Sequence, residues 1–349
     1  MGKGNPYTLT FGKEPTQLIS QAAQSQQVID SFLGTPSSQQ VYMITGIRGS
    51  GKTVFMTEVA HRLASQKDWI VIELNPERDL LTSLAAKLSS ENELARIFQS
   101  AEINLSLFGF GLEVKGAAPP IAEIETALEK MLQSLKKKGK RLLICIDEVT
   151  NTSQMRAFAA AFQIFLRQDL SVYLLMTGLF ENISALQNEK SLTFLYRAPK
   201  ISLGPLNIGT IAEDYQKVLD LSDAKGIALA RLTKGYSFAF QVLGYFTWEH
   251  PDDPQESQRL AREYLDEHAY AKIWSELSRK DKAVLFGIAQ AKSGAIGEIR
   301  VLLGMSSNEF NPYRQRLIHR GIISGEERGY VRMLLPFFDR YVLANYEEL

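Results

Sequence analysis

The stretch "GIRGSGKT", residues Gly46–Thr53, decides the fold of this chain. It matches the pattern G-x-x-x-x-G-K-[ST] at every fixed position, and it lies between an apolar run and an amphipathic segment. Glycines allow the backbone to fold back so that its N–H groups face phosphate oxygens, and a following helix adds its positive end. The predicted phosphate-binding residues, called the phosphate loop from here on, are Gly46, Ile47, Arg48, Gly49, Ser50, Gly51, Lys52 and Thr53.

Two side chains of the phosphate loop have predicted roles of their own. We expect the Lys52 ammonium group to reach the outer phosphates of a nucleotide. We expect the Thr53 hydroxyl group to bind Mg²⁺. The alternative, a glycine-rich turn without a ligand, fits the strand-to-helix context less well.

A second candidate site follows the apolar segment "RLLICIDE", residues 141–148. A buried strand that ends in Asp147 and Glu148 places two carboxylates at the carboxyl edge of a parallel sheet, where ligands of such sheets bind. Asp147 is predicted to hold Mg²⁺, and Glu148 to polarise the attacking water. A surface cap of the strand is the alternative, but the position of the segment after the phosphate loop favours the site.

The segments of the chain alternate between apolar strands and amphipathic helices. The predicted strands are "SQQVYMITG", "DWIVIEL", "RLLICIDE", "LSVYLLMTG" and "PKISLG". This alternation predicts an α/β fold with a parallel sheet covered by helices on both faces. In addition, alternating apolar residues within 101–120 predict either a structural pair of strands or an arm for a partner.

The expected domains are a P-loop domain over 1–206, a helical lid over 207–269 and a third domain over 270–349, called the tail.

In the first domain, Thr177 ends a predicted strand, and its hydroxyl is a candidate contact to the γ-phosphate. Arg197 precedes the last predicted strand. It is a candidate to contact the γ-phosphate bound by its own chain or by a neighbouring copy. Thr177 could equally be an ordinary strand residue, and Arg197 a surface or structural arginine.

The composition excludes several classes of protein. Lys+Arg and Asp+Glu both number 39, so the chain does not have the excess of positive charge typical of proteins that coat DNA. The single cysteine, Cys145, rules out an intramolecular disulfide framework and is expected in the core. No apolar run approaches the roughly 20 residues of a membrane span. A cytoplasmic protein with no membrane partner is therefore expected.

The tail is expected to contain helices, then the segment "SSNEFNPYRQRLIHRGII", then two strands around "GEERG". This order resembles a winged helix, in which one helix enters the major groove of DNA. Arg314, Arg316, His319 and Arg320 lie on or near that helix. Glu326 and Glu327, at the predicted strand turn, would repel phosphate. DNA binding and a purely structural relay to the ATPase domain both stay open.

The chain from about Phe11 to His250 resembles an AAA+-related P-loop ATPase, in the branch of archaeal-type ATPases related to signal-transduction ATPases and origin-recognition proteins. The resemblance rests on "GIRGSGKT", "LLICIDE", the Thr177 strand end and "RAPKISLGPL"; "TFGKEP" resembles the family's entry segment near the adenine. It implies binding of ATP with Mg²⁺ and ATP hydrolysis. Ser237 stands where many relatives have proline, and Lys234 or Arg231 would have to replace a lid arginine, so hydrolysis is expected to be slow or dependent on a partner.

The expected function is that of a nucleotide-dependent switch that binds ATP or ADP and either a protein partner or a second copy. The alternative is a DNA-acting ATPase of replication, repair or mobile-element maintenance that uses residues 270–349. A small-molecule kinase fits less well, because neither the lid nor the tail predicts an acceptor pocket.

Overall fold

The computed structural model describes residues 4–10, 17, 19, 21–101, 103–104, 108, 121–291 and 293–346. They form two compact units. The sheet unit consists of Ala22–Thr45 and Phe55–Ser202, and the helical unit consists of Met1–Gln21, Gly46–Val54 and Leu203–Leu349. The expected strand pair within 101–120 and the expected entry segment at residues 10–15 lie largely outside the described residues.

The sheet unit contains a five-stranded parallel sheet in the order β2-β3-β4-β1-β5. Its strands are β1 (Val41–Thr45), β2 (Trp69–Leu74), β3 (Arg141–Ile146), β4 (Val172–Gly178) and β5 (Lys200–Ser202). The three central strands, β3, β4 and β1, consist largely of buried aliphatic residues, as expected for parallel strands with both faces covered. The predicted α/β fold with a parallel sheet is confirmed.

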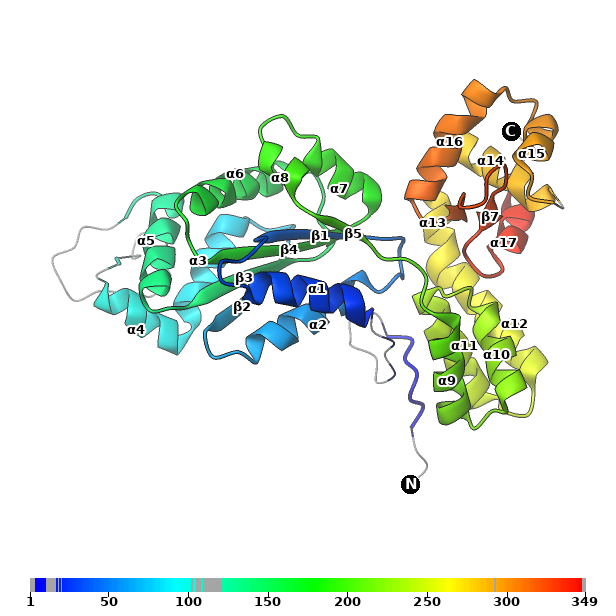
Figure 1. Ribbon diagram of the computed structural model, residues 1–349, viewed down its shortest axis with the longest axis horizontal. Coiled ribbons are helices and arrows are strands. Elements are labelled where there is room, and N and C mark those ends of the chain that lie inside the picture. Colours follow the sequence, from blue (N-terminus) through cyan, green and yellow to red (C-terminus); the bar gives the residue numbers. More distant parts are fainter. Residues whose placement is uncertain are drawn as a thin grey trace. The chain divides into compact units, whose positions relative to one another are not determined.

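Helices cover both faces of this sheet (Figure 1). They are α1 (Ala22–Leu33), α2 (Lys52–Ala64), α3 (Leu80–Ser90), α4 (Asn92–Ser100), α5 (Ile124–Lys137), α6 (Ser153–Arg167), α7 (Phe180–Gln187) and α8 (Thr193–Arg197). Strand residues such as Ile144 and Leu174 pack in one apolar core with α3 to α7. Tyr42 and Tyr173 point to the other face, where their rings contact Phe32 of α1. Burial in this sheet raises the pKa of the Cys145 thiol to about 12, as expected for a core cysteine.

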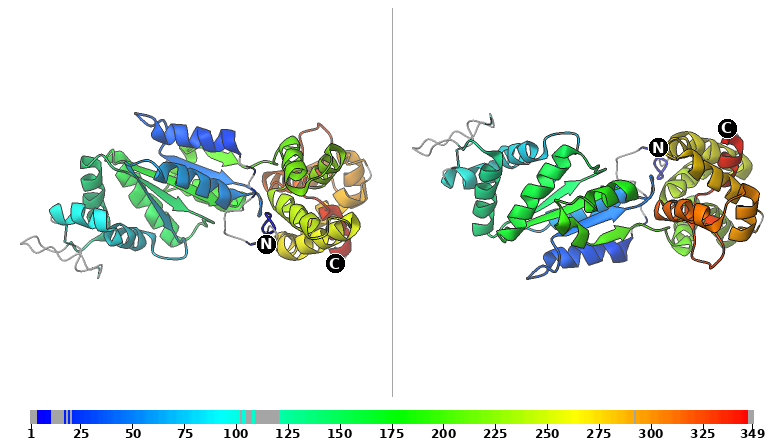
Figure 2. Two further views of the ribbon diagram at one scale, coloured as in Figure 1. Left: turned by 90° about the horizontal axis from the view of Figure 1, so that it is seen from below. Right: turned by 90° about the horizontal axis from the view of Figure 1, so that it is seen from above.

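The helical unit continues from residue 203 to the C-terminus (Figure 2). Its elements are α9 (Ile208–Leu219), α10 (Asp223–Leu232), α11 (Ser237–Glu249), α12 (Pro254–Leu265), the π-helical turn η2 (Asp266–Tyr270), α13 (Ala271–Ser275), α14 (Arg279–Gln290), α15 (Ile296–Leu303), α16 (Ser307–His319), β6 (Ile323–Ser324), β7 (Arg332–Met333) and α17 (Phe338–Asn345). In the tail, the helices α13 to α16 are followed by the antiparallel strand pair β6 and β7, the expected order of helices and then strands, and the likeness to a winged helix stays a prediction.

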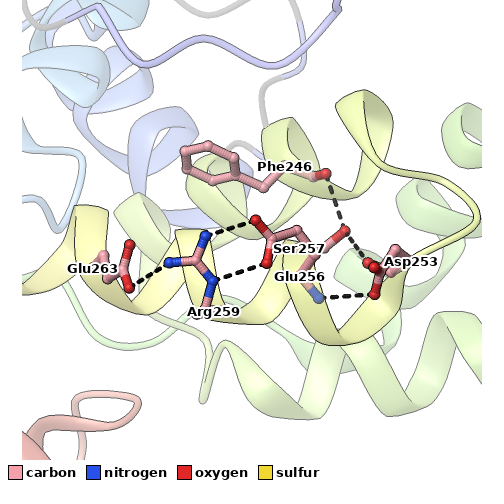
Figure 3. Close-up of polar contacts among 6 residues, drawn as sticks. All are labelled: Phe246, Asp253, Glu256, Ser257, Arg259 and Glu263. Carbon is pink, nitrogen blue, oxygen red and sulfur yellow. Dashed lines mark hydrogen bonds and ion pairs between the residues drawn. The ribbon is translucent and has the colours of Figure 1, made fainter.

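Local hydrogen bonds explain where the helices of this unit begin. The Asp253 carboxylate accepts the backbone N–H of Glu256 and caps α12, whose first residue is Pro254. Figure 3 shows this cap, the Ser257 hydroxyl 3.1 Å from the carbonyl oxygen of Phe246 on α11, and the two ion pairs of Arg259 with Glu256 and Glu263. Of these contacts, the hydrogen bond from Ser257 to Phe246 joins α12 to α11. Complete capping boxes begin α14 and α16.

The N-terminal segment packs on the predicted lid. The buried Tyr7 ring makes edge contacts with Tyr215 and Phe240, and its hydroxyl donates to the Asp214 carboxylate at 2.7 Å. Gly244 of α11 makes room for the ring, because a Cβ atom there would lie 2.6 Å from a Tyr7 ring carbon. The lid and the tail share one apolar core, and their division at residue 270 stays a prediction. Within the described ranges, none of the helices combines the length and the apolar character needed to cross a membrane.

Candidate nucleotide site

The phosphate loop begins directly after β1 and runs into α2, as its sequence predicts. Gly49 and Gly51 have φ angles of 77° and 89°, which only glycine adopts without strain. The Ser50 hydroxyl is buried, with no hydrogen-bond partner among the described residues. A glycine-dependent turn at a helix N-terminus, with an unsatisfied buried hydroxyl inside it, fits a bound phosphate chain.

Lys52 points back into its own loop. Its ammonium group donates to the carbonyl oxygens of Gly46 at 3.1 Å and of Ile47 at 3.0 Å. Phosphate oxygens are stronger acceptors for an ammonium group than backbone carbonyls, because they are charged. Lys52 is therefore positioned to exchange these two carbonyls for phosphate oxygens.

Within the helical unit, residues at the start of α11 hydrogen-bond to the phosphate loop. The Tyr236 hydroxyl donates to the carbonyl oxygen of Arg48 at 2.7 Å, and the backbone N–H of Phe238 donates to the carbonyl oxygen of Gly49 at 3.1 Å. A Cβ atom on Gly49 would lie 2.4 Å from the Tyr236 hydroxyl, so this glycine is required for the approach as well as for its φ angle. Burial raises the pKa of Tyr236 above its ordinary value of 10.0, which keeps the hydroxyl protonated as a donor.

Sequence reasoning missed Tyr236. In the stretch "TKGYSFAFQVLG" it noted Lys234, Gly235 and Ser237 and passed over the tyrosine between them. The usable signal was the glycine that precedes Tyr236, since Gly235 adopts a φ of 76° and a Cβ atom there would lie 2.6 Å from the carbonyl oxygen of Leu206. Gly235 thereby fixes the turn from which Tyr236 reaches the loop.

The sheet unit brings Asp147, Glu148 and Thr177 together. Asp147 and Glu148 follow β3, and Thr177 lies on the neighbouring β4. The Thr177 hydroxyl donates to the Asp147 carboxylate, which also accepts the backbone N–H of Glu148 at 2.9 Å. Thr177 is fully buried, so its observed contact orients Asp147. The predicted contact of Thr177 to a γ-phosphate stays a prediction.

Glu148 has a strained backbone. Its φ angle is 52°, in the left-handed region that residues with a side chain rarely adopt. The next residue anchors this conformation, because the backbone N–H of Val149 donates to the carbonyl oxygen of Thr177 at 2.9 Å. Such strain is concentrated at functional sites. The Glu148 side chain is exposed directly after the strand.

Arg197 is not part of this cluster of polar contacts in the described structure. It is exposed at the C-terminal end of α8, beside Tyr196, whose side chain is 72% exposed. This position is accessible to a second molecule, and a role in reading phosphate stays a prediction. No group of three or more His, Cys, Asp or Glu residues that could bind a metal by itself occurs in the described parts of the chain.

The two candidates for a lid arginine differ in their contacts. The Lys234 ammonium group donates to the carbonyl oxygens of Met333 at 3.2 Å and Leu335 at 3.3 Å, so this side chain links the lid to the tail. Burial lowers the pKa of Lys234 from 10.5. Arg231 is exposed on α10.

In the tail, Arg316 of α16 forms a structural ion pair. Its guanidinium group donates twice to one carboxylate oxygen of Asp281, at 2.9 and 2.6 Å, and Asp281 is 1% exposed. Arg320 donates to the carbonyl oxygen of Glu276 at 3.3 Å. Two of the arginines proposed to face DNA therefore also bind acceptors within the protein.

Two sequence families match the chain. Residues 32–203 match an ATPase domain predominantly from Archaea, and residues 267–342 match a domain of unknown function, DUF8462. None of the curated proteins compared with the chain matches it.

Solved structures with the same fold include the Walker-type ATPase of Pyrococcus abyssi, at 15% identity and a TM-score of 0.63, over 93% of this chain and 96% of that one. They also include the ORC2 protein of Aeropyrum pernix in its ADPNP-ADP complexes, at 14% identity and a TM-score of 0.58, over 96% and 97%. At these identities the likeness shows the fold alone. Residues 32–203, which include the phosphate loop, therefore match an ATPase domain predominantly from Archaea, and the chain has the fold of these P-loop ATPase structures.

Proposed function

We propose that the protein is a nucleotide-dependent switch that binds Mg-ATP in the phosphate loop and hydrolyses it slowly. Lys52 holds the outer phosphates, and Thr53 and Asp147 hold Mg²⁺. Mg²⁺ neutralises the charge that develops on the phosphates during transfer. Glu148 accepts a proton from the attacking water. Arg197 completes the site from the same chain or from a second copy.

One observation carries the binding proposal. Every fixed position of the loop pattern is present, and the two glycines adopt the positive φ angles that turn successive N–H groups to one side. Thr177 supports the metal proposal, because its hydrogen bond to the Asp147 carboxylate orients that side chain.

The switch proposal rests on the contacts of the loop with the start of α11, within the helical unit. The carbonyl oxygens of Arg48 and Gly49 accept hydrogen bonds from the start of α11. A loop that changes when phosphate binds must change these contacts too, so the lid responds to the nucleotide.

The switch is tested by comparing wild type with Glu148→Gln. We expect slow phosphate release by wild type and none above background by the variant, which keeps its affinity for ATP. Light scattering of ATP-loaded Glu148→Gln, with ADP-loaded wild type as the control, then shows whether ATP drives self-association. Unchanged turnover in Glu148→Gln contradicts the assigned base.

A DNA-acting ATPase is the second candidate. The observation in its favour is the Tyr313 ring of α16, which has two cations near it: the Lys280 ammonium at 5.8 Å and the Arg316 guanidinium at 5.0 Å from its centroid. Aromatic and basic side chains together suit nucleic acid. The ion pair of Arg316 with buried Asp281 weakens this candidate, since breaking it would leave a buried charge.

DNA binding is tested by the salt dependence of duplex affinity for the full chain. Binding through phosphates requires a slope of about −0.9 per contact in a plot of log affinity against log salt. Substituting Arg314, Arg316 and Arg320 together with alanine is expected to flatten that slope if the tail faces DNA. Absent or salt-independent binding leaves the switch as the function.

A further inference from the structure

Two neighbouring residues of the phosphate loop contact the tail. The Arg48 guanidinium lies 3.4 Å from a carboxylate oxygen of Glu276. Ile47 packs against the apolar core of the helical unit, and a Cβ atom on Gly321 would lie 3.8 Å from its Cβ atom. The middle of the loop, far from the tail in sequence, is therefore tied to the region that matches the domain of unknown function.

Glu276 is the point where several elements of the tail meet the loop. The carboxylate oxygen that faces Arg48 also lies 3.5 Å from the Lys272 ammonium, one turn earlier in the helix. The backbone carbonyl of Glu276 accepts the hydrogen bond from Arg320, at the end of α16. A movement of Arg48 would therefore change the contacts of Glu276 with both α13 and α16.

Arg48 is held at both ends in this structure. Its carbonyl oxygen accepts the Tyr236 hydroxyl, and its side chain pairs with Glu276. Lys52 meanwhile donates to the carbonyl oxygens of Gly46 and Ile47, which precede Arg48. A phosphate chain that draws Lys52 away frees these carbonyls and changes the peptide adjoining Arg48.

We propose that Glu276 is a positioning residue that couples nucleotide occupancy of the phosphate loop to the tail. It holds Arg48 in the loop conformation in which Lys52 donates to the carbonyl oxygens of Gly46 and Ile47, and phosphate binding, which draws Lys52 away, loosens this ion pair. The inference rests on the proposed binding of Mg-ATP and assigns the means by which residues 267–342 sense it. Because coupling is reciprocal, removing the Glu276 charge must strengthen nucleotide binding.

The expected change in Mg-ATP affinity depends on how far the Arg48 and Glu276 side chains are exposed to solvent. The Arg48 and Glu276 side chains are 36% and 32% exposed, so solvent and salt screen their attraction. We therefore expect a change of about two- to fivefold in the dissociation constant of Mg-ATP, the range for a partly exposed ion pair. High salt is expected to reduce this change in the dissociation constant, because it screens the ion pair.

The test is a double-mutant cycle on Mg-ATP affinity, measured by calorimetry with the full chain. Glu276→Gln is expected to bind Mg-ATP two- to fivefold more tightly than wild type. In an Arg48→Gln background, the same substitution is expected to change nothing. The matched control is Glu263→Gln, which removes an exposed carboxylate paired with Arg259 on α12. Equal effects in both backgrounds, or none in wild type, overturn the inference.

Hydrogen exchange distinguishes coupling between the phosphate loop and the tail from a general effect of removing the Glu276 charge on ATP affinity. Mg-ATP is expected to raise exchange over residues 271–277 in wild type, and Glu276→Gln is expected to exchange at the raised level before ATP is added. Unchanged exchange on ATP binding overturns the inference while the proposed function stands. Absence of Mg-ATP binding by wild type contradicts the proposed function itself.

Discussion

The hydroxyl of Tyr236 donates to the carbonyl oxygen of Arg48 across 2.7 Å, and this contact joins the first turn of the lid helix α11 to the middle of the phosphate loop. The hydrogen bond fixes the peptide group that contains the Arg48 carbonyl, so that the adjoining backbone N–H groups of the loop keep their direction. The loop therefore depends on a residue 188 positions further along the chain.

Tyr236→Phe tests this contact. Leaving the partly buried carbonyl of Arg48 without its donor is expected to lower the free energy of unfolding by about 1–3 kcal/mol and to weaken Mg-ATP binding several-fold. The matched control is Tyr215→Phe, because the Tyr215 hydroxyl also donates to a backbone carbonyl, that of Phe240, at 2.7 Å. Urea unfolding should show similar losses for both variants. Equal nucleotide affinities in the two variants would refute the assignment of Tyr236 to the loop.

Thr177→Val is expected to impair metal binding selectively. It removes the hydroxyl that orients Asp147 and keeps the volume of the buried side chain. The gain in ATP affinity on adding Mg²⁺ should shrink, while affinity without Mg²⁺ stays unchanged. Thr177→Ser retains the hydroxyl and is expected to restore the gain. A Thr177→Val protein with the full Mg²⁺ effect would show that this hydrogen bond is only structural.

Arg197→Ala is expected to slow hydrolysis far more than it weakens ATP binding, because Arg197 is exposed and would complete the site only on closure or association. Steady-state phosphate release and calorimetry measure the two quantities. Arg167→Ala on α6, another exposed arginine of the sheet unit, is the control. Parallel losses of turnover and affinity would mark Arg197 as a structural residue.

Sequence patterns predicted the parts of the protein that are encoded locally. Buried aliphatic runs gave the strands, and the spacing of glycines and lysine gave the loop. Tyr236 could not be predicted, since its contact to Arg48 depends on the packing of the lid. The ion pair of Arg316 with Asp281 was missed for the same reason: helix periodicity places an arginine on a face but does not show which buried carboxylate it meets.

The Asp214 carboxylate is expected to make stability depend on pH. Burial raises its pKa in the folded protein above the ordinary 3.8, so the folded state holds a proton that the unfolded state has lost. The free energy of unfolding should therefore rise as the pH falls through the raised pKa toward 3.8. Asp214→Asn, which still accepts from Tyr7, should lose this rise relative to wild type in urea unfolding. Glu213→Gln is the exposed control, and an identical pH profile for wild type and Asp214→Asn would exclude Asp214 as its source.

The central claim is that the phosphate loop binds Mg-ATP, and calorimetric titration of Mg-ATP into wild type and Lys52→Ala tests it most directly. Lys52→Ala removes the ammonium group expected on the outer phosphates, and the loss of a charged hydrogen bond corresponds to about 10- to 100-fold in affinity. Lys225→Ala, which removes an exposed lysine on α10, controls for net charge. The account predicts saturable binding by wild type and Lys225→Ala, with a loss of at least about tenfold in Lys52→Ala. Equal affinity in all three proteins would contradict it.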